Sequence, residues 1–139
     1  MSAVLQSTAP ASTSLRDSAE LAGRILLVAL FLLSGVGKIS AYEATAGYMS
    51  AMGVPGALLP LVIGFEIAAA VAIMVGWRTR LAAFLLAGFS LVTAVAFHSN
   101  FGDQIQMILF LKNVSIAGAL LLLVAHGAGR FSLDARAGR

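Results

Sequence analysis

The chain has 139 residues, of which 60% are hydrophobic and 11% are charged, with a formal net charge of +3 and no cysteine. Soluble domains carry about 45–50% apolar and about 25% charged residues, so this composition indicates a membrane protein of one compact unit. The small, dispersed positive charge argues against a partner made of nucleic acid. Without cysteine there are no disulfides, dithiol redox centres or thiolate-held clusters, and we expect no intrinsic cofactor.

The N-terminal part of the chain contains a Ser/Thr-rich tail followed by a first apolar segment. Residues 1–15 are predicted to be disordered. They are not read as a signal peptide, because no basic residue precedes the apolar run and no small-residue cleavage site follows it. The first span is predicted at 19–39. Arg24 and Lys38 are about 20 Å apart along this helix, so we expect both to snorkel toward opposite interfaces of the roughly 30 Å hydrocarbon core.

Three further apolar segments are long enough to cross a membrane, at 56–76, 79–98 and 104–127. Residues 16–130 are therefore expected to form an all-α integral membrane four-helix bundle, followed by a cytoplasmic tail at 131–139. With four spans, every arginine falls at the same end of the bundle. By the positive-inside rule, both termini are expected in the cytoplasm. These arginines are Arg16, Arg24, Arg78, Arg80, Arg130, Arg136 and Arg139.

Two charged residues are predicted to lie deep inside the bundle. Counted from the outer end of each helix, Glu66 lies about 15 Å and Lys112 about 12 Å into the second and fourth spans. A lysine at the centre of a span costs about 2.5–3.5 kcal/mol on insertion, so Lys112 is not expected to face lipid. Opposite charges at similar depth predict a shared Glu66–Lys112 site. Such a pair either fixes helix order or takes part in ligand binding or proton transfer.

The remaining polar residues are concentrated in the outer half of the bundle. This pattern predicts a cavity open to the outside, with Glu66 and Lys112 near its floor. The other candidate cavity residues are Lys38, Ser90, Thr93, His98, Asp103, Gln104, Gln106 and Asn113. Lys38 and His98 are also open to a simpler interpretation, as an interfacial anchor and a solvated histidine.

A metal site is not expected from this sequence. No close group of His, Asp and Glu has ligand spacing, and His98 and His126 are predicted at opposite membrane faces, about 30 Å apart.

Several short segments, in this order and spacing, resemble the DoxX family of small bacterial inner-membrane proteins. They are "RILLVALFLLSGVGKI", "AMGVP" after Tyr48, "FE" at 65–66, "GWRTRLAA", "FLKNVSIAGALLLL" and "GAGRFSLD". The resemblance implies a four-helix membrane bundle and a link to respiratory or redox chemistry. Family namesakes include small subunits of a thiosulfate:quinone oxidoreductase and partners of secreted redox enzymes. The resemblance transfers no catalytic role onto this chain.

Three functions remain open at this point. The first is a redox-associated subunit that binds a quinone, or a small oxygenated or sulfur-containing compound, in the outer cavity. The second is a small proton-coupled transporter using Glu66, which a lysine partner disfavours because a paired carboxylate titrates at low pH. The third is a structural or assembly subunit without chemistry of its own. The expected partners are the lipid bilayer, a redox-enzyme subunit or a second copy of the chain.

Overall fold

The computed structural model describes residues 13–139, and every regular element in this range is a helix. The predicted disordered tail lies outside the described residues except for its last three, which already belong to the first helix. The elements are α1 (Thr13–Ser40), α2 (Tyr42–Ala51), the short 3-10 helix η1 (Gly56–Leu58), α3 (Leu59–Val75), α4 (Thr79–Phe97), α5 (Gln104–His126) and α6 (Leu133–Arg136). This confirms the all-α class.

Four helical segments are long and apolar enough to cross a membrane. They are α1, the continuous η1–α3 segment at Gly56–Val75, α4 and α5. The predicted spans agree with them, apart from α1, which starts several residues earlier. Local signals set the ends: Pro60 lies in the first turn of α3, and Gly76 ends it in the left-handed conformation. Asp103 caps α5 by accepting hydrogen bonds from the N–H groups of Ile105 and Gln106.

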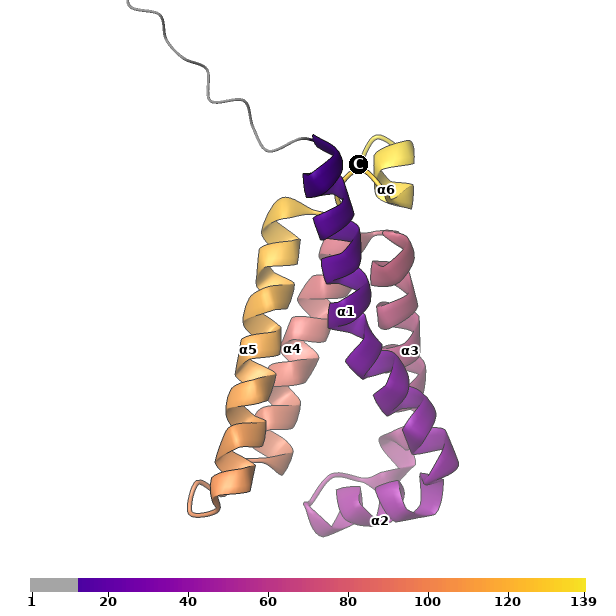
Figure 1. The fold of residues 1–139 in the computed structure, drawn as a ribbon. Coiled ribbons are helices and arrows are strands. Elements are labelled where there is room, and N and C mark those ends of the chain that lie inside the picture. The colour runs from indigo at the N-terminus through magenta and orange to yellow at the C-terminus, as the bar shows by residue number, and fades with distance from the viewer. Residues whose placement is uncertain (1–12) are drawn as a thin grey trace, which may run out of the picture.

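The helices pack as two pairs, α1 with α3 and α4 with α5, which α3 joins through its contact with α4. Figure 1 shows that α1 and α5 diverge toward the end where α2 lies across the bundle. The main core fills the other half, around Val28, Ile73 and Leu86, with several buried alanines that allow close helix approach. A smaller core of Met49, Leu59 and Ile63 fixes α2 against α3.

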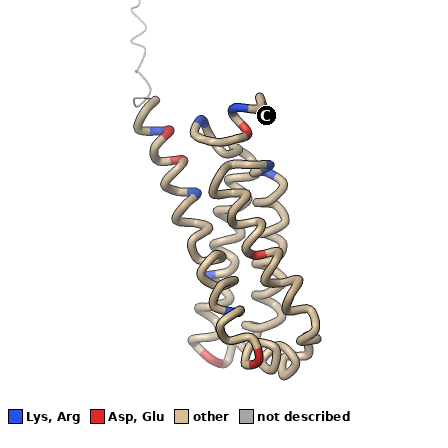
Figure 2. The backbone as a smooth tube through the Cα atoms, turned by 90° about the vertical axis from the view of Figure 1, so that its right-hand side faces the viewer, with Lys and Arg blue, Asp and Glu red and all other residues tan. Residues whose placement is uncertain are grey.

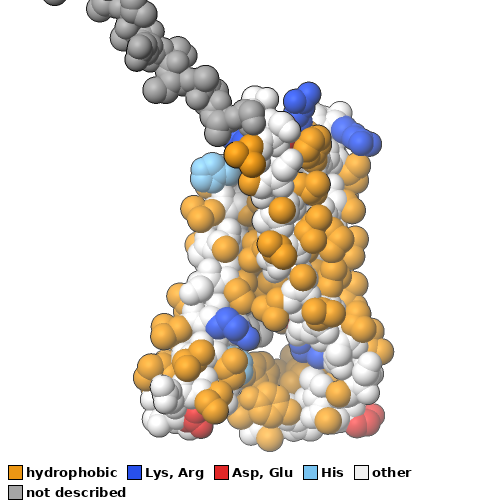
Figure 3. Space-filling view, viewed as in Figure 1, with side chains coloured by type: hydrophobic (Ala, Val, Ile, Leu, Met, Phe, Trp, Pro, Cys, Tyr) orange, Lys and Arg blue, Asp and Glu red, His pale blue; other side chains and the backbone are white. Residues whose placement is uncertain are grey.

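The surface has the distribution expected of a membrane-embedded bundle. Exposed large hydrophobic side chains such as Leu26, Leu61 and Leu122 cover the long helices, and Figure 3 shows them along most of one face. Figure 2 shows the basic positions gathered mostly at the end that carries α6.

Arg24 is buried and cross-links three parts of the chain at that basic end. Its Nη1 donates to the carbonyls of Ile73 (3.0 Å) and Met74 (3.2 Å), and its Nη2 donates to the carbonyl of Phe131. Arg24 is thus directed toward the end of α3, but its guanidinium is buried by protein and not solvated as snorkelling implies. The last carbonyls of a helix have no partner within it. At the end of α3, Arg24 donates to those of Ile73 and Met74, and the N–H groups of Gly76 and Trp77 donate to those of Ile73 and Ala72.

The segment after α5 folds back over the turn between α3 and α4. Asp134 accepts hydrogen bonds from the N–H groups of Arg78 and Thr79, both at 2.8 Å, and its own N–H donates to the carbonyl of Gly76 at 2.8 Å. Asp134 thus caps the N-terminus of α4, which carries no cap of its own. The expected tail at 131–139 is instead an ordered cap that includes α6.

Candidate functional site

A cavity of about 450 Å³ lies where the two helix pairs diverge. Figure 3 shows it as a hollow near one end of the molecule. All four spans and α2 contribute to its walls, which are largely apolar, with aromatic rings from Phe31, Tyr48, Phe89 and Phe97. The polar lining residues are Ser34, Lys38, Thr45, Glu66, Ser90, Thr93, His98, Lys112 and Asn113.

Glu66 forms a short ion pair with Lys38, not with Lys112. Lys38 Nζ lies 2.8 Å from Glu66 Oε2 and 2.5 Å from Ser34 Oγ, while the Glu66 side chain is only 3% exposed. Lys38 Nζ and Glu66 Oε2 are close enough for an ion pair, but their angles do not meet those of a hydrogen bond. The attraction between the two side chains is therefore mainly electrostatic. The predicted Glu66–Lys112 pair is therefore wrong in its partner. Similar depth did not decide the pairing, because α3 packs along α1 and not along α5.

Lys112 lines the same cavity from the opposite pair of helices. Within residues 13–139 it forms no ion pair, and its side chain is exposed in the isolated bundle. Next to it, Asn113 Nδ2 donates to Thr93 Oγ1 at 3.4 Å, and Thr93 Oγ1 donates to the Ser90 carbonyl at 3.0 Å. Asn113, Thr93 and Ser90 therefore form a polar strip along the α4–α5 contact.

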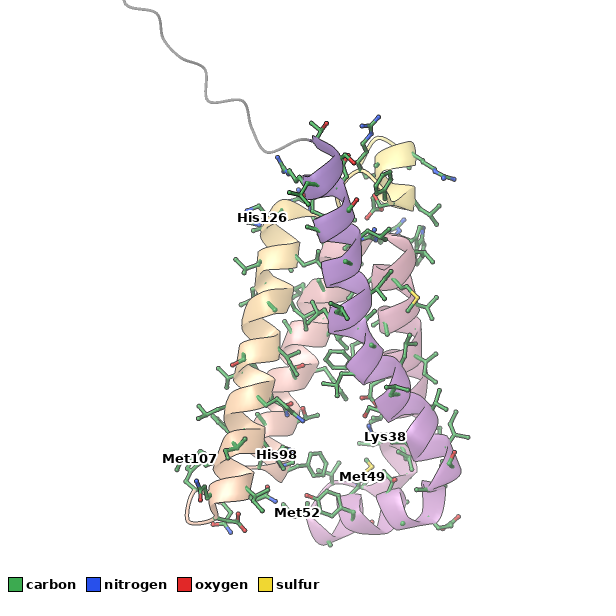
Figure 4. All side chains as sticks on the ribbon, viewed as in Figure 1. Lys38, Met49, Met52, His98, Met107 and His126 are labelled. Atoms are coloured by element: carbon green, nitrogen blue, oxygen red, sulfur yellow. The ribbon has the colours of Figure 1, made fainter. Side chains whose placement is uncertain are left out.

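His98 lies at the C-terminal end of α4, on the side of the cavity that is lined by α2. Its Nδ1 lies 2.8 Å from Gln106 Oε1, which ties the α4–α5 connection together. Asp103 and Gln104 are exposed and do not line the cavity, since Asp103 serves as the cap of α5. Figure 4 shows Lys38 and His98 toward the same end of the bundle and His126 at the other, as predicted.

The contribution of α2 was not expected from the sequence. The sequence predicts no helix between the spans at 19–39 and 56–76, but Thr45, Tyr48 and Met49 line the cavity from α2. The Tyr48 and Phe97 rings stack with centroids 5.6 Å apart, which joins α2 to the end of α4. Ser34 was also missed, although its position four residues before Lys38 places the two on one helix face.

The charges of the cavity lining leave an excess of positive charge. Two lysines face one carboxylate, and His98 adds a further hydrogen-bonding ring. Such a lining can hold an anion or donate hydrogen bonds to carbonyl oxygens in an otherwise apolar space. Across the part of the chain that the structure describes, no group of three or more His, Cys, Asp or Glu residues has the arrangement of a metal site.

Comparison with known proteins gives a family and two named relatives. A model described as DoxX matches residues 19–99. The chain is 48% identical over 120 residues to the inner membrane protein YqjF of Escherichia coli (strain K12), covering 86% of this chain and 92% of YqjF. It is 41% identical over 123 residues to the inner membrane protein YphA of the same organism, covering 84% of this chain and 88% of YphA. No solved structure matches the chain.

Proposed function

Because the chain belongs to the DoxX family and is an inner membrane protein, we propose that its cavity binds the headgroup of a membrane-soluble redox compound. A quinone is the first candidate, and a small oxygenated or sulfur-containing compound is the second. In this proposal the protein is a non-catalytic or quinone-binding subunit of an oxidoreductase. The arginine-rich end faces the cytoplasm by the positive-inside rule, so both termini are cytoplasmic and the cavity faces outward.

The main support is the position of Lys112 on the wall of an apolar cavity inside a membrane span. A lysine there is costly unless a partner or a ligand compensates its charge. Glu66 is already engaged by Lys38, and Lys112 has no ionic partner in the described residues. Lys112 carries three N–H donors, and Asn113 beside it carries an amide. These two residues are the proposed contacts for a ligand carbonyl or anion.

The size and walls of the cavity also agree with a ring-shaped headgroup. A volume of about 450 Å³ is within the range of about 300–1,000 Å³ typical of small-molecule sites. Phe89 and Phe97 come from α4 and Phe31 from α1, so a planar ring would have aromatic side chains on two sides.

Access from the bilayer would suit a ligand with an apolar tail. Leu30 of α1 and Val92 of α4 line the cavity, yet they are 42% and 66% exposed on the sides of the bundle. In a membrane those sides face lipid, so a tail can remain in the bilayer while the headgroup occupies the cavity. A purely water-soluble ligand would not need this lateral opening.

The proposal is tested by extracting bound small molecules from protein purified in mild detergent with native lipid. Quinone is then quantified by absorbance and mass spectrometry for wild type, Lys112→Met and Val114→Met. Val114 is exposed on the same helix and does not line the cavity, which makes it a matched control. A lost charge-assisted hydrogen bond costs about 1.5–3 kcal/mol. The Lys112→Met protein should therefore bind quinone at least about tenfold more weakly and carry correspondingly less of it after purification. Wild-type protein without quinone, or equal retention in all three proteins, would contradict the proposal.

A structural or assembly role is the alternative that the geometry also favours. The Lys38–Glu66 pair joins α1 to α3 and is sufficient to fix the order of these helices without any ligand. This role predicts a reproducible protein partner in mild-detergent pull-downs and no bound small molecule.

A proton-coupled transporter is less well supported, since Glu66 is engaged by a lysine. That role would require pH-dependent uptake in proteoliposomes that is abolished by Glu66→Gln.

A further inference from the structure

A second cavity lies at the opposite end of the molecule from the proposed ligand site. It has a volume of about 530 Å³ and is formed by the α3–α4 turn, the end of α5 and the C-terminal segment. Its lining includes Arg78, Arg80, Arg130 and Arg139, four of the nine basic residues in the chain. The only acidic residue in the lining is Asp134, and its carboxylate already accepts two backbone N–H groups.

Arg80 is held by the fold, and Arg80 and Arg130 both retain donors for a ligand. Arg80 Nη1 donates to the carbonyls of Val124 (3.2 Å) and Ala125 (3.1 Å) at the end of α5. A guanidinium has five N–H donors, so further donors remain on Arg80. Arg130 Nη1 lies 3.6 Å from the carboxylate of Asp17, which is buried, while the Arg130 side chain is 75% exposed. This one contact leaves the other donors of the Arg130 guanidinium available.

The backbone of Arg78 has an unusual conformation. It has a φ of 45° in the left-handed region, where an L-residue other than glycine is strained. Strain of this kind persists where the surrounding structure or a bound group compensates it, and it clusters at ligand sites. The Arg78 guanidinium lies 5.6 Å from the centre of the exposed Trp77 ring. Trp is favoured at the membrane–water interface, which places Arg78 at headgroup depth.

We propose that this cavity binds the phosphate group of an anionic phospholipid. The planar fork of arginine matches phosphate oxygens, and several such forks surround one space here. Basic pockets at the ends of membrane helices bind acidic headgroups in this manner. Because the site uses residues of the α3–α4 turn and the C-terminal segment, the bound lipid would hold the ordered cap onto the bundle. This inference does not depend on a ligand in the outer cavity.

The test compares two double variants that remove the same charge. Arg78→Gln/Arg130→Gln removes two cations that line the cavity, and Arg16→Gln/Arg136→Gln removes two exposed cations that do not. Each double variant also breaks one ion pair, Arg130 with the buried Asp17 and Arg16 with the partly exposed Glu20. Native mass spectrometry of the full chain then measures binding of the first phosphatidylglycerol molecule, with phosphatidylcholine as the neutral reference.

Arg78→Gln/Arg130→Gln is expected to weaken binding of the first phosphatidylglycerol molecule by about 30-fold, because each cation contributes about fivefold. Arg16→Gln/Arg136→Gln should change this binding by less than about twofold. Equal weakening by both pairs would show diffuse attraction and overturn the proposal, as would wild-type protein that binds both lipids equally. If Arg78→Gln/Arg130→Gln fails to fold, Arg130→Gln alone should weaken binding about fivefold. Inorganic phosphate is added last, at ionic strength matched with chloride. Failure to displace the lipid supports a lipid site, and displacement would overturn it in favour of free phosphate.

Discussion

Replacing Lys38 by Met is expected to destabilise the protein strongly, because it leaves the Glu66 carboxylate buried without its ionic partner. Breaking a buried pair from one side costs about 3–5 kcal/mol. The Lys38 side chain is 23% exposed and that of Glu66 only 3%, so we place the cost of Lys38→Met near the lower end, at about 3 kcal/mol. Removal of Glu66 should cost less, about 1 kcal/mol, since Lys38 keeps its contact with Ser34 and can extend toward the interface.

The double variant Lys38→Met/Glu66→Met is expected to be within about 1 kcal/mol of wild type, because an apolar pair of similar volume often replaces a buried ion pair without loss. With single-variant costs of about 3 and 1 kcal/mol, the coupling between the two positions is about 3 kcal/mol. Unfolding of the protein in mixed micelles, followed by circular dichroism as the proportion of denaturing detergent rises, gives the four free energies.

A parallel cycle of Glu66→Met with Lys112→Met provides the control. Lys112 forms no ion pair within the described residues, so its coupling to Glu66 should remain below about 1 kcal/mol. Larger coupling of Glu66 to Lys112 than to Lys38 would refute the assignment of the pair.

Three further predictions concern helix packing and the ordered cap. A Cβ at Gly35 would lie 2.7 Å from Ile67 Cγ1, so Gly35→Ala should destabilise the protein by about 1–3 kcal/mol in micelle unfolding. A Cβ at Gly37 would meet nothing within 4 Å, so Gly37→Ala should stabilise the protein by about 0.5–1 kcal/mol. Similar effects at both glycines would contradict close α1–α3 packing. Arg24→Met should cost about 3 kcal/mol and expose the C-terminal segment to protease, since it removes the Arg24 donors to the part-buried carbonyls of Met74 and Phe131 and the contact that joins α1 to the C-terminal segment. Unchanged proteolysis would contradict that role. Burial raises the pKa of Asp134, but the hydrogen bonds from backbone N–H groups outweigh this effect and hold the pKa below its usual value of about 3.9. Its stabilisation is therefore complete above about pH 5 and is lost as the pH falls below about 4, so the stability of wild type and Asp134→Asn should converge on acidification. A constant difference down to pH 3 would contradict this.

The four membrane-spanning helices were predictable because they depend on the length and apolar composition of each segment. Twenty apolar residues must be helical in a bilayer, since every backbone polar group needs a partner within its own segment. Capping signals such as Pro60 and Asp103 then set the helix ends. By contrast, α2 has little hydrophobic contrast between its faces, and its position follows from the Tyr48–Phe97 contact that only the folded chain contains.

The residues of the candidate site were predictable in part, and their contacts were not. Depth along each span placed Glu66, Lys112 and His98 in one half of the bundle, and all three line the cavity, whereas Asp103 and Gln104 do not. Depth alone does not specify which helices are neighbours, and so it selected Lys112 instead of Lys38 as the partner of Glu66. The contacts of Arg24 were not predictable for a related reason. Its acceptors are main-chain carbonyls, which every residue has, so the residue types carry no sign of them.

The bond between Arg24 and the Phe131 carbonyl has a consequence for biosynthesis. Its two residues are 107 positions apart, which corresponds to roughly 5–20 s of translation. The first helix is made before any of the three carbonyls that accept from Arg24. Arg24 lacks all three until Ile73 and Met74, 49 and 50 residues later, are synthesised, and it lacks the third until Phe131 follows. The native arrangement at this end can form only after the last span has left the ribosome. A nascent chain stalled before residue 131 should therefore be a better substrate for membrane quality-control proteases than the finished protein.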